Sequence, residues 1–543
     1  MSNTHRNPTD TEINAVIKFY TSGQIEEARA VLIRLTRKYP NEALLYNFLG
    51  VCYATLNQTE AALGSFESAL RINPDNAEVH YNLGNTLQAC DRLNASIKSY
   101  TRALEINPFH ADTHINLGNA FKGIGNIEKA VSHYEHAIQI NPSYTEAHCN
   151  LGNTLHVIGN LEAAISCYQQ ALSIDPSDAE AHNCLGNTYN DLGKTDAALS
   201  AIEQALTIKP TNPQFWASYA TALHQKKFKT FNESFSNYLV KTLQQPTINP
   251  NYIAPAIVSA LQQHPKIKLA IKASKNDLIE KNLPFFSDQL ASISLFLALL
   301  ENCPIADPQI EYLLTQMRRA TLNQLFDSVL NGIDFSFYYS LALHCFTNEY
   351  IFFESDEEIQ NVTKLENKIN YQVNNNLPIP PIWIVLLASY RPLHNYLWAE
   401  QLQKTALPVN SHKILTRQLF DIKKEQHLKT KIHQLTSIND STSNAVKEQY
   451  EQNPYPRWIN PGLFDNPKTI RENLHAINPQ LSIDDNHYSK MPNILIAGCG
   501  TGQHALNSQS RFLNCTVLAI DLSLNSLSYA MRKTHELSIT NIN

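Results

Sequence analysis

Asp75-Asn-Ala-Glu-Val-His-Tyr-Asn-Leu-Gly-Asn-Thr-Leu-Gln-Ala-Cys-Asp-Arg-Leu-Asn-Ala-Ser-Ile-Lys-Ser-Tyr-Thr-Arg-Ala-Leu-Glu-Ile-Asn-Pro108 is one unit of a pattern that fills the N-terminal part of the chain. Prolines recur every 34 residues, at positions 40, 74, 108, 142, 176 and 210. A leucine–glycine pair keeps the same step, at 49–50, 83–84, 117–118, 151–152 and 185–186. A fixed period of this length predicts a solenoid of helices whose core forms only when the units stack.

Small and aromatic residues also hold fixed places in each unit. Alanine or serine stands twelve residues before each proline, at Ala28, Ala62, Ser96, Ala130, Ala164 and Ala198. Alanine again stands five residues before it, except for Leu35 in the first unit, and the aromatic residues Phe66, Tyr100, Tyr134 and Tyr168 stand eight before it. The small residues should let two antiparallel helices approach closely, and the rings should fill the gap to the next unit. The proline then ends the second helix.

Six units in phase over residues 9–212 resemble the tetratricopeptide repeat (TPR). The resemblance implies a superhelix of helix pairs whose concave groove binds a peptide or protein partner. A seventh first helix is expected at residues 213–226, with residues 231–244 as its partner or as a cap, because the terminal units of a solenoid are atypical. We therefore expect the array and its capping helices to span residues 9–245.

Asparagines form two files along the first helices of the repeats. They precede the leucine at Asn82, Asn116 and Asn150, and follow the glycine at Asn85, Asn119, Asn153 and Asn187. Positions three apart lie on one side of a helix, and the files resemble the asparagine ladder inside the TPR superhelix of O-GlcNAc transferase. An amide both donates and accepts, so it can bind an extended peptide backbone of almost any sequence. The alternative is that the asparagines merely reflect recent duplication.

Acidic residues and histidines also recur with the 34-residue period. Acidic residues at 78, 112, 146 and 180 are expected on the asparagine face, where they would favour cationic segments. Histidines stand at 80, 114, 148 and 182, but Tyr46 and Trp216 take this slot in the flanking units. Adjacent repeats are too far apart to share ligands, and no acid or cysteine spacing completes a site. We interpret these histidines as packing residues and expect no metal.

The composition sets limits on partners and compartment. The chain has 543 residues, a formal net charge of -6 and a pI near 6.4, so it has no basic field for nucleic acid and no polybasic patch for a membrane. Nine cysteines without a C-x-x-C pair fit a reducing cytoplasm. The N-terminus lacks an apolar signal segment, and the longest apolar runs are shorter than a membrane span. We expect a cytoplasmic protein with neither nucleic-acid nor membrane partners.

Residues 246–440 lose the period but keep a helical composition, with proline-rich breaks at 246–255 and 378–381. An acidic run at 353–358 lacks the spacing and the glycine of a calcium loop. It is expected to be a solvated helix N-terminus capped by Ser355. The pattern predicts an all-helical region and gives no further function.

Residues 441–490 contain Gln449-Tyr-Glu-Gln-Asn-Pro-Tyr-Pro-Arg-Trp458, a stretch dense in aromatic residues and proline. Its composition predicts a rigid, partly buried, extended segment. It is similar to the N-P-P-Y motif of amino-methyltransferases, but it precedes the first expected strand instead of following the fourth, and Tyr455 takes the second-proline position. We expect a lid or strap across a ligand mouth, with a catalytic role and plain packing as alternatives.

Asn493-Ile-Leu-Ile-Ala-Gly-Cys-Gly-Thr-Gly-Gln503 joins an apolar run to three alternate glycines. Residues 494–497 are expected to form a fully buried strand, 503–512 a helix, 516–520 a second strand and 523–537 a second helix. Gly498, Gly500 and Gly502 would let the backbone turn sharply and approach a ligand. Asp521, at the end of the second strand, is placed to accept both ribose hydroxyls of a nucleotide-like ligand.

This glycine loop and its acid resemble the first two motifs of class I S-adenosylmethionine (SAM) dependent methyltransferases. With the TPR units, His344-Cys-Phe-Thr-Asn-Glu-Tyr350 and Tyr390-Arg-Pro-Leu-His394, the chain resembles bacterial TPR-containing methyltransferases over nearly its whole length. The resemblance implies that Gly498, Gly500, Thr501 and Gly502 hold the methionine part of SAM and that Asp521 holds its ribose. NAD or FAD is the alternative, although Gln503 replaces the last glycine of a dinucleotide site. Cys499 is a small loop residue in that family, and a reactive thiol is the alternative.

The sequence thus predicts a mainly α protein: a TPR superhelix, a helical middle region, and the N-terminal part of a Rossmann-like methyltransferase domain over residues 491–543. The third strand with its adenine-contacting acid, and the fourth strand, are expected beyond residue 543, so no general base can be named. The predicted function is SAM-dependent methyl transfer to a protein substrate delivered by the TPR groove. The alternatives are a non-catalytic TPR scaffold and, more remotely, glycosyl transfer by analogy with O-GlcNAc transferase.

Overall fold

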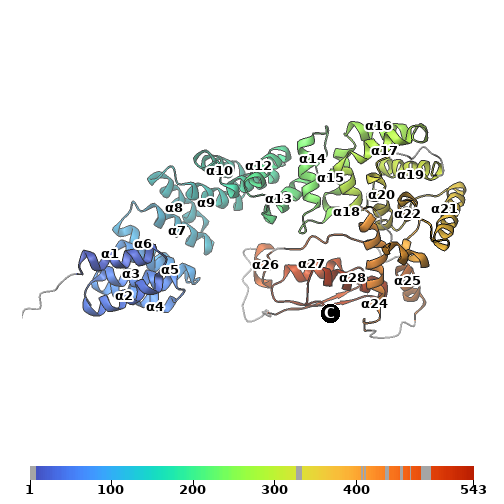
Figure 1. The fold of residues 1–543 in the computed structure, drawn as a ribbon. Coiled ribbons are helices and arrows are strands. Elements are labelled where there is room, and N and C mark those ends of the chain that lie inside the picture. The colour runs from blue at the N-terminus through green and yellow to red at the C-terminus, as the bar shows by residue number, and fades with distance from the viewer. Residues whose placement is uncertain are drawn as a thin grey trace, which may run out of the picture. The chain divides into compact units, whose positions relative to one another are not determined.

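The computed structural model describes residues 8–224, 226–325, 333–404, 408, 411–433, 440–452, 457–464, 466–477 and 491–543. The chain divides into two compact units, Met1–Thr211 and Asn212–Asn543. Figure 1 shows helices along almost all of the described chain and two short strands near its C-terminal end.

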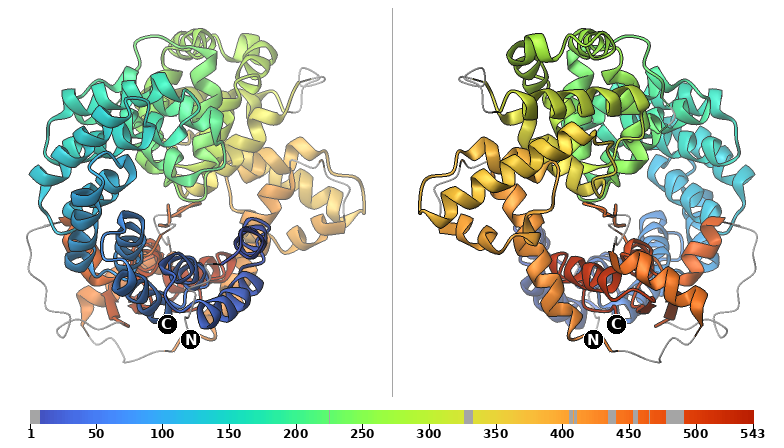
Figure 2. Two further views of the ribbon diagram at one scale, coloured as in Figure 1. Left: turned by 90° about the vertical axis from the view of Figure 1, so that its left-hand side faces the viewer. Right: turned by 90° about the vertical axis from the view of Figure 1, so that its right-hand side faces the viewer.

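Unit 1 is a curved row of six helix pairs, drawn from blue to teal in Figure 2, as the 34-residue period predicts. The first helices of the pairs are α1 (Asp10–Thr21), α3 (Ala43–Thr55), α5 (Ala77–Ala89), α7 (Ala111–Gly123), α9 (Thr145–Val157) and α11 (Ala179–Asp191). The second helices are α2 (Ile25–Lys38), α4 (Thr59–Ile72), α6 (Leu93–Ile106), α8 (Ile127–Ile140), α10 (Leu161–Ile174) and α12 (Thr195–Ile208). Each second helix ends two residues before the periodic proline, so the predicted stop signal is confirmed.

The turn inside each pair repeats a left-handed backbone conformation. Residues 23, 57, 91, 125, 159 and 193 all have positive φ, between 56° and 81°. Four of them are glycine, and the other two, Asn57 and Asp91, are of the types that tolerate this conformation best. The period therefore fixes the turn backbone as well as the helix faces.

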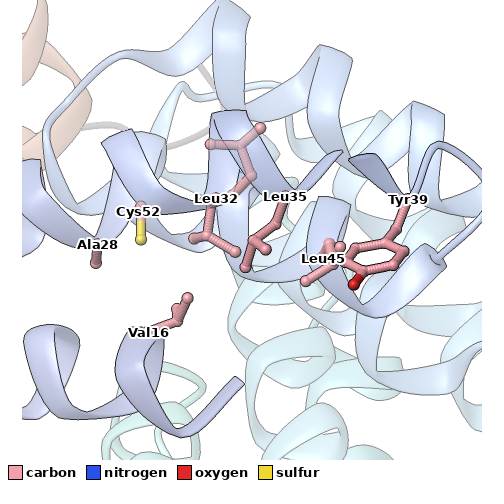
Figure 3. Packing of buried hydrophobic residues seen from close by; sticks show 8 residues of the cluster. Val16, Ala28, Leu32, Leu35, Tyr39, Leu45 and Cys52 are labelled. Carbon is pink, nitrogen blue, oxygen red and sulfur yellow. The ribbon is translucent and has the colours of Figure 1, made fainter. Parts of the chain in front are cut away.

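Close packing of an aromatic ring on a glycine joins the two helices of a pair. A Cβ built on Gly50, Gly84, Gly118 or Gly152 would lie 2.5–2.8 Å from a ring carbon of the residue sixteen positions on, which is Phe66, Tyr100, Tyr134 or Tyr168. The predicted close approach is confirmed, but the ring fills space inside its own repeat as well as toward the next. At the N-terminal end, Val16, Leu32, Leu45 and Cys52 belong to one buried cluster that joins the first three helices (Figure 3).

Unit 2 begins with a helical region in which proline starts several helices. Its helices are α13 (Pro213–Leu223), α14 (Glu233–Leu243), α15 (Pro250–Leu261), α16 (Pro265–Ser274), α17 (Leu283–Ala291), α18 (Ser294–Asn302), α19 (Pro308–Asn323), α20 (Ser336–Thr347), α21 (Asp356–Asn374), α22 (Pro381–Ala388), α23 (Ser411–Leu415), α24 (Asp421–Lys429), α25 (Ser441–Gln452) and α26 (Ile470–Ile477). The described part of unit 2 also has the 3₁₀ helices η1 (Glu280–Asn282), η3 (Leu393–Asn395) and η4 (Leu397–Lys404) and the π-helical segment η5 (Thr416–Phe420). Proline suits a first helical position because its missing N–H would have no intrahelical partner there.

Charged residues are buried in the middle of unit 2. Ser355 caps α21 as predicted, with its hydroxyl accepting from the Glu358 backbone N–H at 3.2 Å. Glu358, however, is 1 % exposed, which corrects the expectation that this acidic run is solvated throughout. Its carboxylate accepts from the Tyr390 hydroxyl at 2.9 Å and lies 3.9 Å from the buried Arg318 guanidinium. The pair can be buried because hydrogen bonds and opposite charge replace water.

The C-terminal part of unit 2 contains β1 (Asn493–Ala497), α27 (Gln503–Arg511), β2 (Thr516–Ile520) and α28 (Leu524–Glu536), the predicted β-α-β-α order (Figure 1). The strands are parallel, with Ile494 opposite Val517 and Ile496 opposite Ala519. Ile542 forms a parallel bridge with Val517 on the other side of β2. The structure shows these two short strands and does not show a complete Rossmann-like domain.

The prediction of a fully buried first strand is wrong. Ile496 and Val517 are buried in a cluster with Ala505 of α27, but Leu495 is 63 % exposed and Leu518, directly opposite it, is 47 % exposed. Successive side chains of a strand point to opposite faces, and only one face of this sheet is covered within the described chain.

No single helix of the described residues is long and apolar enough to cross a membrane. The bent pair Glu280–Ala291 and Ser294–Asn302 reaches the length and apolar composition of a span when the two helices are taken together, and its residues Leu290, Leu295 and Phe296 are buried in the protein.

Candidate functional site

Tyrosines on the second helices hold the second asparagine file. Hydroxyls of Tyr100, Tyr134 and Tyr168 donate to the Oδ1 atoms of Asn85, Asn119 and Asn153 at 2.7, 2.7 and 2.8 Å. Burial raises the pKa of Tyr134 to about 12, which keeps its proton on the oxygen as a donor. The side-chain oxygen of each of these asparagines is therefore held by a tyrosine. The NH₂ group of the same amide is turned away from that tyrosine.

The first asparagine file makes bonds between repeats. Asn82 Nδ2 donates to Asn47 Oδ1 at 3.1 Å, and Asn116 Nδ2 donates to Asn85 Oδ1 at 2.9 Å and to the Tyr81 hydroxyl at 3.3 Å. These side chains lie on neighbouring first helices, so the amides form a ladder as well as a surface. The sequence did not single out Asn47 or Tyr81 because their partners are 35 residues away.

Several amide groups remain for a partner. Within the described residues, the side chains of Asn150 and Asn187 and the Nδ2 atoms of Asn119 and Asn153 have no hydrogen-bond partner. All four residues are half-buried, so they are accessible but held by their neighbours. The sequence marks this pairing only in part: Phe66 coincides with Val51 in the second unit, but Asn187 coincides with Ile202 in the sixth.

The acidic file flanks the amides. Glu78, Glu146 and Glu180 are exposed, whereas Asp112 is half-buried and accepts a hydrogen bond from the Tyr144 hydroxyl. That bond, together with burial, raises the pKa of Tyr144. Glu180 lies 3.9 Å from Lys209 Nζ, so Glu78 and Glu146 are the two carboxylates of this file that are exposed and unpaired among the described residues.

The histidine file has a structural role. The Nε2 atoms of His80, His114, His148 and His182 each pair with the carbonyl oxygen of the proline six residues earlier, at 2.9–3.1 Å. The imidazole N–H thus closes the loop between consecutive repeats. In the described part of the chain, no group of three or more His, Cys, Asp or Glu side chains is arranged to hold a metal ion.

The glycine loop connects β1 to α27 with three left-handed residues. Gly498, Gly500 and Gly502 have φ of 70°, 53° and 84°. A Cβ on Gly498 or Gly500 would meet no atom within 4 Å, whereas one on Gly502 would lie 2.5 Å from Ala530 Cβ of α28. The first two glycines thus leave open space at the carboxyl ends of the strands, and the third is needed for helix packing.

Asp521 is held beside this loop. Its Oδ2 accepts from the Gly500 backbone N–H at 2.8 Å, and its Oδ1 accepts from the Ser523 N–H at 2.9 Å. The carboxylate is therefore oriented by two backbone groups while each oxygen keeps a lone pair. Thr501 is buried, and the thiol of Cys499, also buried, has its pKa raised to about 12 by burial and by Asp521. A neutral thiol at this pKa is a poor nucleophile.

Trp458 ties the preceding segment to the loop. Its indole N–H donates to the Thr501 carbonyl at 3.0 Å, and its ring packs against Leu506 and Tyr529. The neighbouring Arg457 forms a buried ion pair with Glu349 and lies over the Phe346 ring at 4.8 Å. The strap, defined here as residues 457–462, thus joins the helical region to the glycine loop.

Helix α25 also reaches this edge of the sheet. The Glu451 carboxylate accepts from the backbone N–H groups of Leu524 and Asn525 at the start of α28, and from Lys429 Nζ at 2.7 Å. Although burial opposes it, the hydrogen bonds from Lys429 and from Asn525 lower the pKa of Glu451. Residues 449–452 belong to α25. This corrects the prediction that the stretch is extended from Gln449 onward. Residues 453–456, which carry the N-P-P-Y comparison, lie outside the described residues.

Comparisons with known proteins concern the repeat array. Family models described as tetratricopeptide repeats match residues 75–143, 133–166 and 179–212, and a model described as a TPR repeat matches residues 53–91 and 156–193. Residues 53–212 are therefore TPR repeats, as the sequence predicts. None of the curated proteins matches the chain.

Solved structures similar to this chain include MamA and two proteins described as TPR proteins. MamA is 25% identical over 31% of this chain and 97% of its own, with a TM-score of 0.29. TTC0263, a thermophilic TPR protein of Thermus thermophilus, is 26% identical over 33% and 98%, with a TM-score of 0.28. YrrB, described as a TPR protein with an unusual peptide-binding site, is 23% identical over 36% and 98%, with a TM-score of 0.31.

Proposed function

We propose that the chain is a TPR scaffold that binds an extended peptide or protein segment along its two asparagine files. The observation that carries this proposal is the set of unpartnered amide groups at Asn119, Asn150, Asn153 and Asn187, of which Asn119 and Asn153 are held by tyrosine hydroxyls. A peptide backbone presents one N–H and one C=O per residue, and primary amides match both.

The held orientation reduces the entropic cost of binding. Because Tyr134 and Tyr168 fix the oxygens of Asn119 and Asn153, the NH₂ groups need no reorientation when a carbonyl arrives. The exposed carboxylates of Glu78 and Glu146 add attraction for lysine or arginine in the partner. Backbone bonds would supply affinity of low sequence specificity, and charge would select basic segments.

Fluorescence anisotropy of the full chain tests the proposal. The probe is a labelled peptide of about 20 alternating alanine and lysine residues, long enough to cover several repeats. Asn150→Ala combined with Asn187→Ala should weaken its binding by about tenfold. The control is Asn94→Ala, an exposed asparagine on a second helix. Equal binding to the wild type and the double variant would refute an amide-lined site.

The glycine loop carries a second candidate function, the binding of SAM. The residues fit such a ligand: Gly498 and Gly500 leave open space, and Asp521 presents an oriented carboxylate at the carboxyl ends of two parallel strands. Bound SAM would supply a methyl group on a sulfonium. The chain's own residues would accept the ribose hydroxyls at Asp521 and give the ligand backbone access at the two glycines, while Trp458 holds the loop.

Calorimetric titration of the full chain with S-adenosylhomocysteine tests this second candidate. Asp521→Asn should lower the affinity by about tenfold or more, because the amide cannot accept two hydroxyls as the carboxylate does. Asp440→Asn, at an exposed carboxylate that caps α25, is the control. Identical affinities for the Asp521 variant and the wild type would exclude the ribose assignment without bearing on the TPR groove.

A further inference from the structure

A pocket of about 1090 Å³ lies between α6, α7 and α8. Its apolar wall includes Leu104, Leu117 and Phe121, and its polar wall includes Lys129, His133 and His136 of α8 together with His114 of α7. It lies within unit 1 and uses none of the asparagines of the two files. Its volume is slightly above the usual range of sites for small organic ligands, about 300–1,000 Å³.

The polar wall is a departure from the chain's own repeat. At the position of Lys129, the second, third, fifth and sixth units have Ala61, Ala95, Ala163 and Ala197. At that of His133 they have Ser65, Ser99, Cys167 and Ala201, and at that of His136 they have Ser68, Arg102, Gln170 and Gln204. Four units thus form their helix pairs with small residues at two of these places. The lysine and two histidines are therefore not required to build the repeat.

Hydrogen bonding assigns the protons of the three imidazoles. His114 Nε2 lies 3.1 Å from the Pro108 carbonyl, so it must donate, and its Nδ1 must accept from His133 Nδ1 at 3.1 Å. His136 Nδ1 donates to the Ser132 carbonyl at 2.6 Å. The Nε2 atoms of His133 and His136 therefore carry lone pairs. Neither Nε2 has a hydrogen-bond partner among the described residues.

The unpaired charge on the pocket wall is that of Lys129. The Lys129 ammonium lies 5.1 Å from the Phe121 ring centre and pairs with no carboxylate of the described chain. The one lining carboxylate, Glu105 of α6, is taken by Arg102 at 2.8 Å. Burial, His114, His136 and Lys129 together lower the pKa of His133 to about 4, so this imidazole is neutral until an anion arrives.

We propose that this pocket binds a small organic carboxylate with an apolar body, and that a proton is taken up from solvent as it binds. The body packs against Leu104, Leu117 and Phe121. The carboxylate accepts from the Lys129 ammonium and from an imidazole that has gained a proton on Nε2. Each imidazole donor stays fixed through its Nδ1 bond, so the geometry is in place before the ligand. The site is independent of the TPR groove function.

Proton uptake gives the binding a definite pH dependence. A nearby carboxylate stabilises imidazolium and raises the pKa of His133 toward its ordinary value. The affinity must therefore increase as pH falls from about 7.5 to about 5.5, where the ligand itself is still ionised. The groups facing the two imidazoles are Lys129 on α8, His114 on α7 and the Arg102-paired Glu105 on α6.

Calorimetry of the full chain with three matched ligands tests the proposal: 4-phenylbutyrate, 4-phenylbutanol and 4-phenylbutylamine. 4-Phenylbutyrate should bind about tenfold more tightly than 4-phenylbutanol. 4-Phenylbutylamine should bind most weakly of the three. Titration in two buffers of different ionisation enthalpy should show net proton uptake. Equal affinities for the three ligands, or affinity that does not change with pH, would overturn the proposal.

Variants that use the chain's own residues separate binding from folding. His133→Ser with His136→Gln, the residues of neighbouring units, should abolish the pH dependence and the preference for the carboxylate. Lys129→Ala alone changes an exposed side chain. It should weaken the binding of 4-phenylbutyrate by several-fold and leave the affinity for 4-phenylbutanol unchanged. Unchanged carboxylate binding in the lysine variant would contradict the site even if the histidine variant did not fold. Tighter binding of a leucine-ended peptide than of 4-phenylbutyrate would overturn the small-molecule assignment.

Discussion

Two buried tryptophans in unit 2 differ in one hydrogen bond, and this difference can be measured. The Trp458 indole N–H donates to the Thr501 carbonyl, whereas the buried Nε1 of Trp398 has no partner in the described chain. Trp458→Phe should lower the free energy of unfolding by about 1–3 kcal/mol more than Trp398→Phe, because only the first leaves a buried carbonyl without its donor. Urea denaturation followed by circular dichroism measures both. Equal losses would show that the hydrogen bond from Trp458 to Thr501 adds no net stability.

The sequence predicted the rigid segment around Trp458 but not the hydrogen bond that its indole donates. The density of proline and aromatic residues before Trp458 indicated a rigid segment near the glycine loop. The acceptor is 43 residues away and is a backbone atom, so no side-chain pattern marks it. The place of Asp521 directly after β2 was easier to predict, since it follows from the local apolar run, whereas its bonds to Gly500 and Ser523 were not predicted. The loop and the acid are local features, whereas the contact that holds them is a tertiary one.

At the scale of elements, the glycine that follows each periodic leucine sets the distance between two helices. A Cβ on Gly118 would lie 2.7 Å from a ring carbon of Tyr134, at a position enclosed by both helices. Gly118→Ala should therefore lower the free energy of unfolding by about 1–3 kcal/mol through overpacking. Gly64→Ala is the control, because Gly64 lies in the interior of α4, is exposed, and has no atom within 4 Å of its Cβ site.

The control should change stability in the other direction. Alanine is a better helix former than glycine, so Gly64→Ala should raise the free energy of unfolding by up to about 1 kcal/mol. Thermal denaturation of the two variants beside the wild type gives the comparison. If both substitutions stabilised the chain, helix propensity would outweigh the ring contact, and the periodic glycine would have no packing role.

The helices of the repeat array were predictable from the sequence because the same residue pattern recurs in each unit. The sheet was less predictable. Six in-phase units averaged out local irregularity, so the bounds of α3 to α12 follow from the proline and the leucine–glycine pair. The strands of residues 493–497 and 516–520 were found from their apolar runs, but their burial was not. A run such as Ile494-Leu-Ile-Ala is typical of a parallel strand covered on both faces. Leu495 and Leu518 are exposed because covering a face depends on neighbouring elements, which the strand's own residues do not specify.

At the scale of the whole molecule, the described chain forms two compact units with separate cores. The loss of the 34-residue period predicted a change of architecture near residue 245, and the structural division lies at residues 211/212. Helices α13 and α14, expected to cap the array, belong to unit 2. A pattern in sequence shows where the repeat stops, whereas a compact unit is defined by which helices share a core.

Separate cores predict separate unfolding transitions. A repeat array gains its stability from contacts between neighbouring units, and unit 2 has its own buried cluster and ion pairs, so each should unfold as its own cooperative element. Differential scanning calorimetry of the full chain should therefore resolve two transitions. Gly118→Ala should lower only one of them, by about 2–4 °C for each kcal/mol lost, and Trp458→Phe should lower only the other. A single transition lowered by both variants would show instead that the two units share one cooperative fold, in which case a ligand at the glycine loop would also stabilise the asparagine-lined groove.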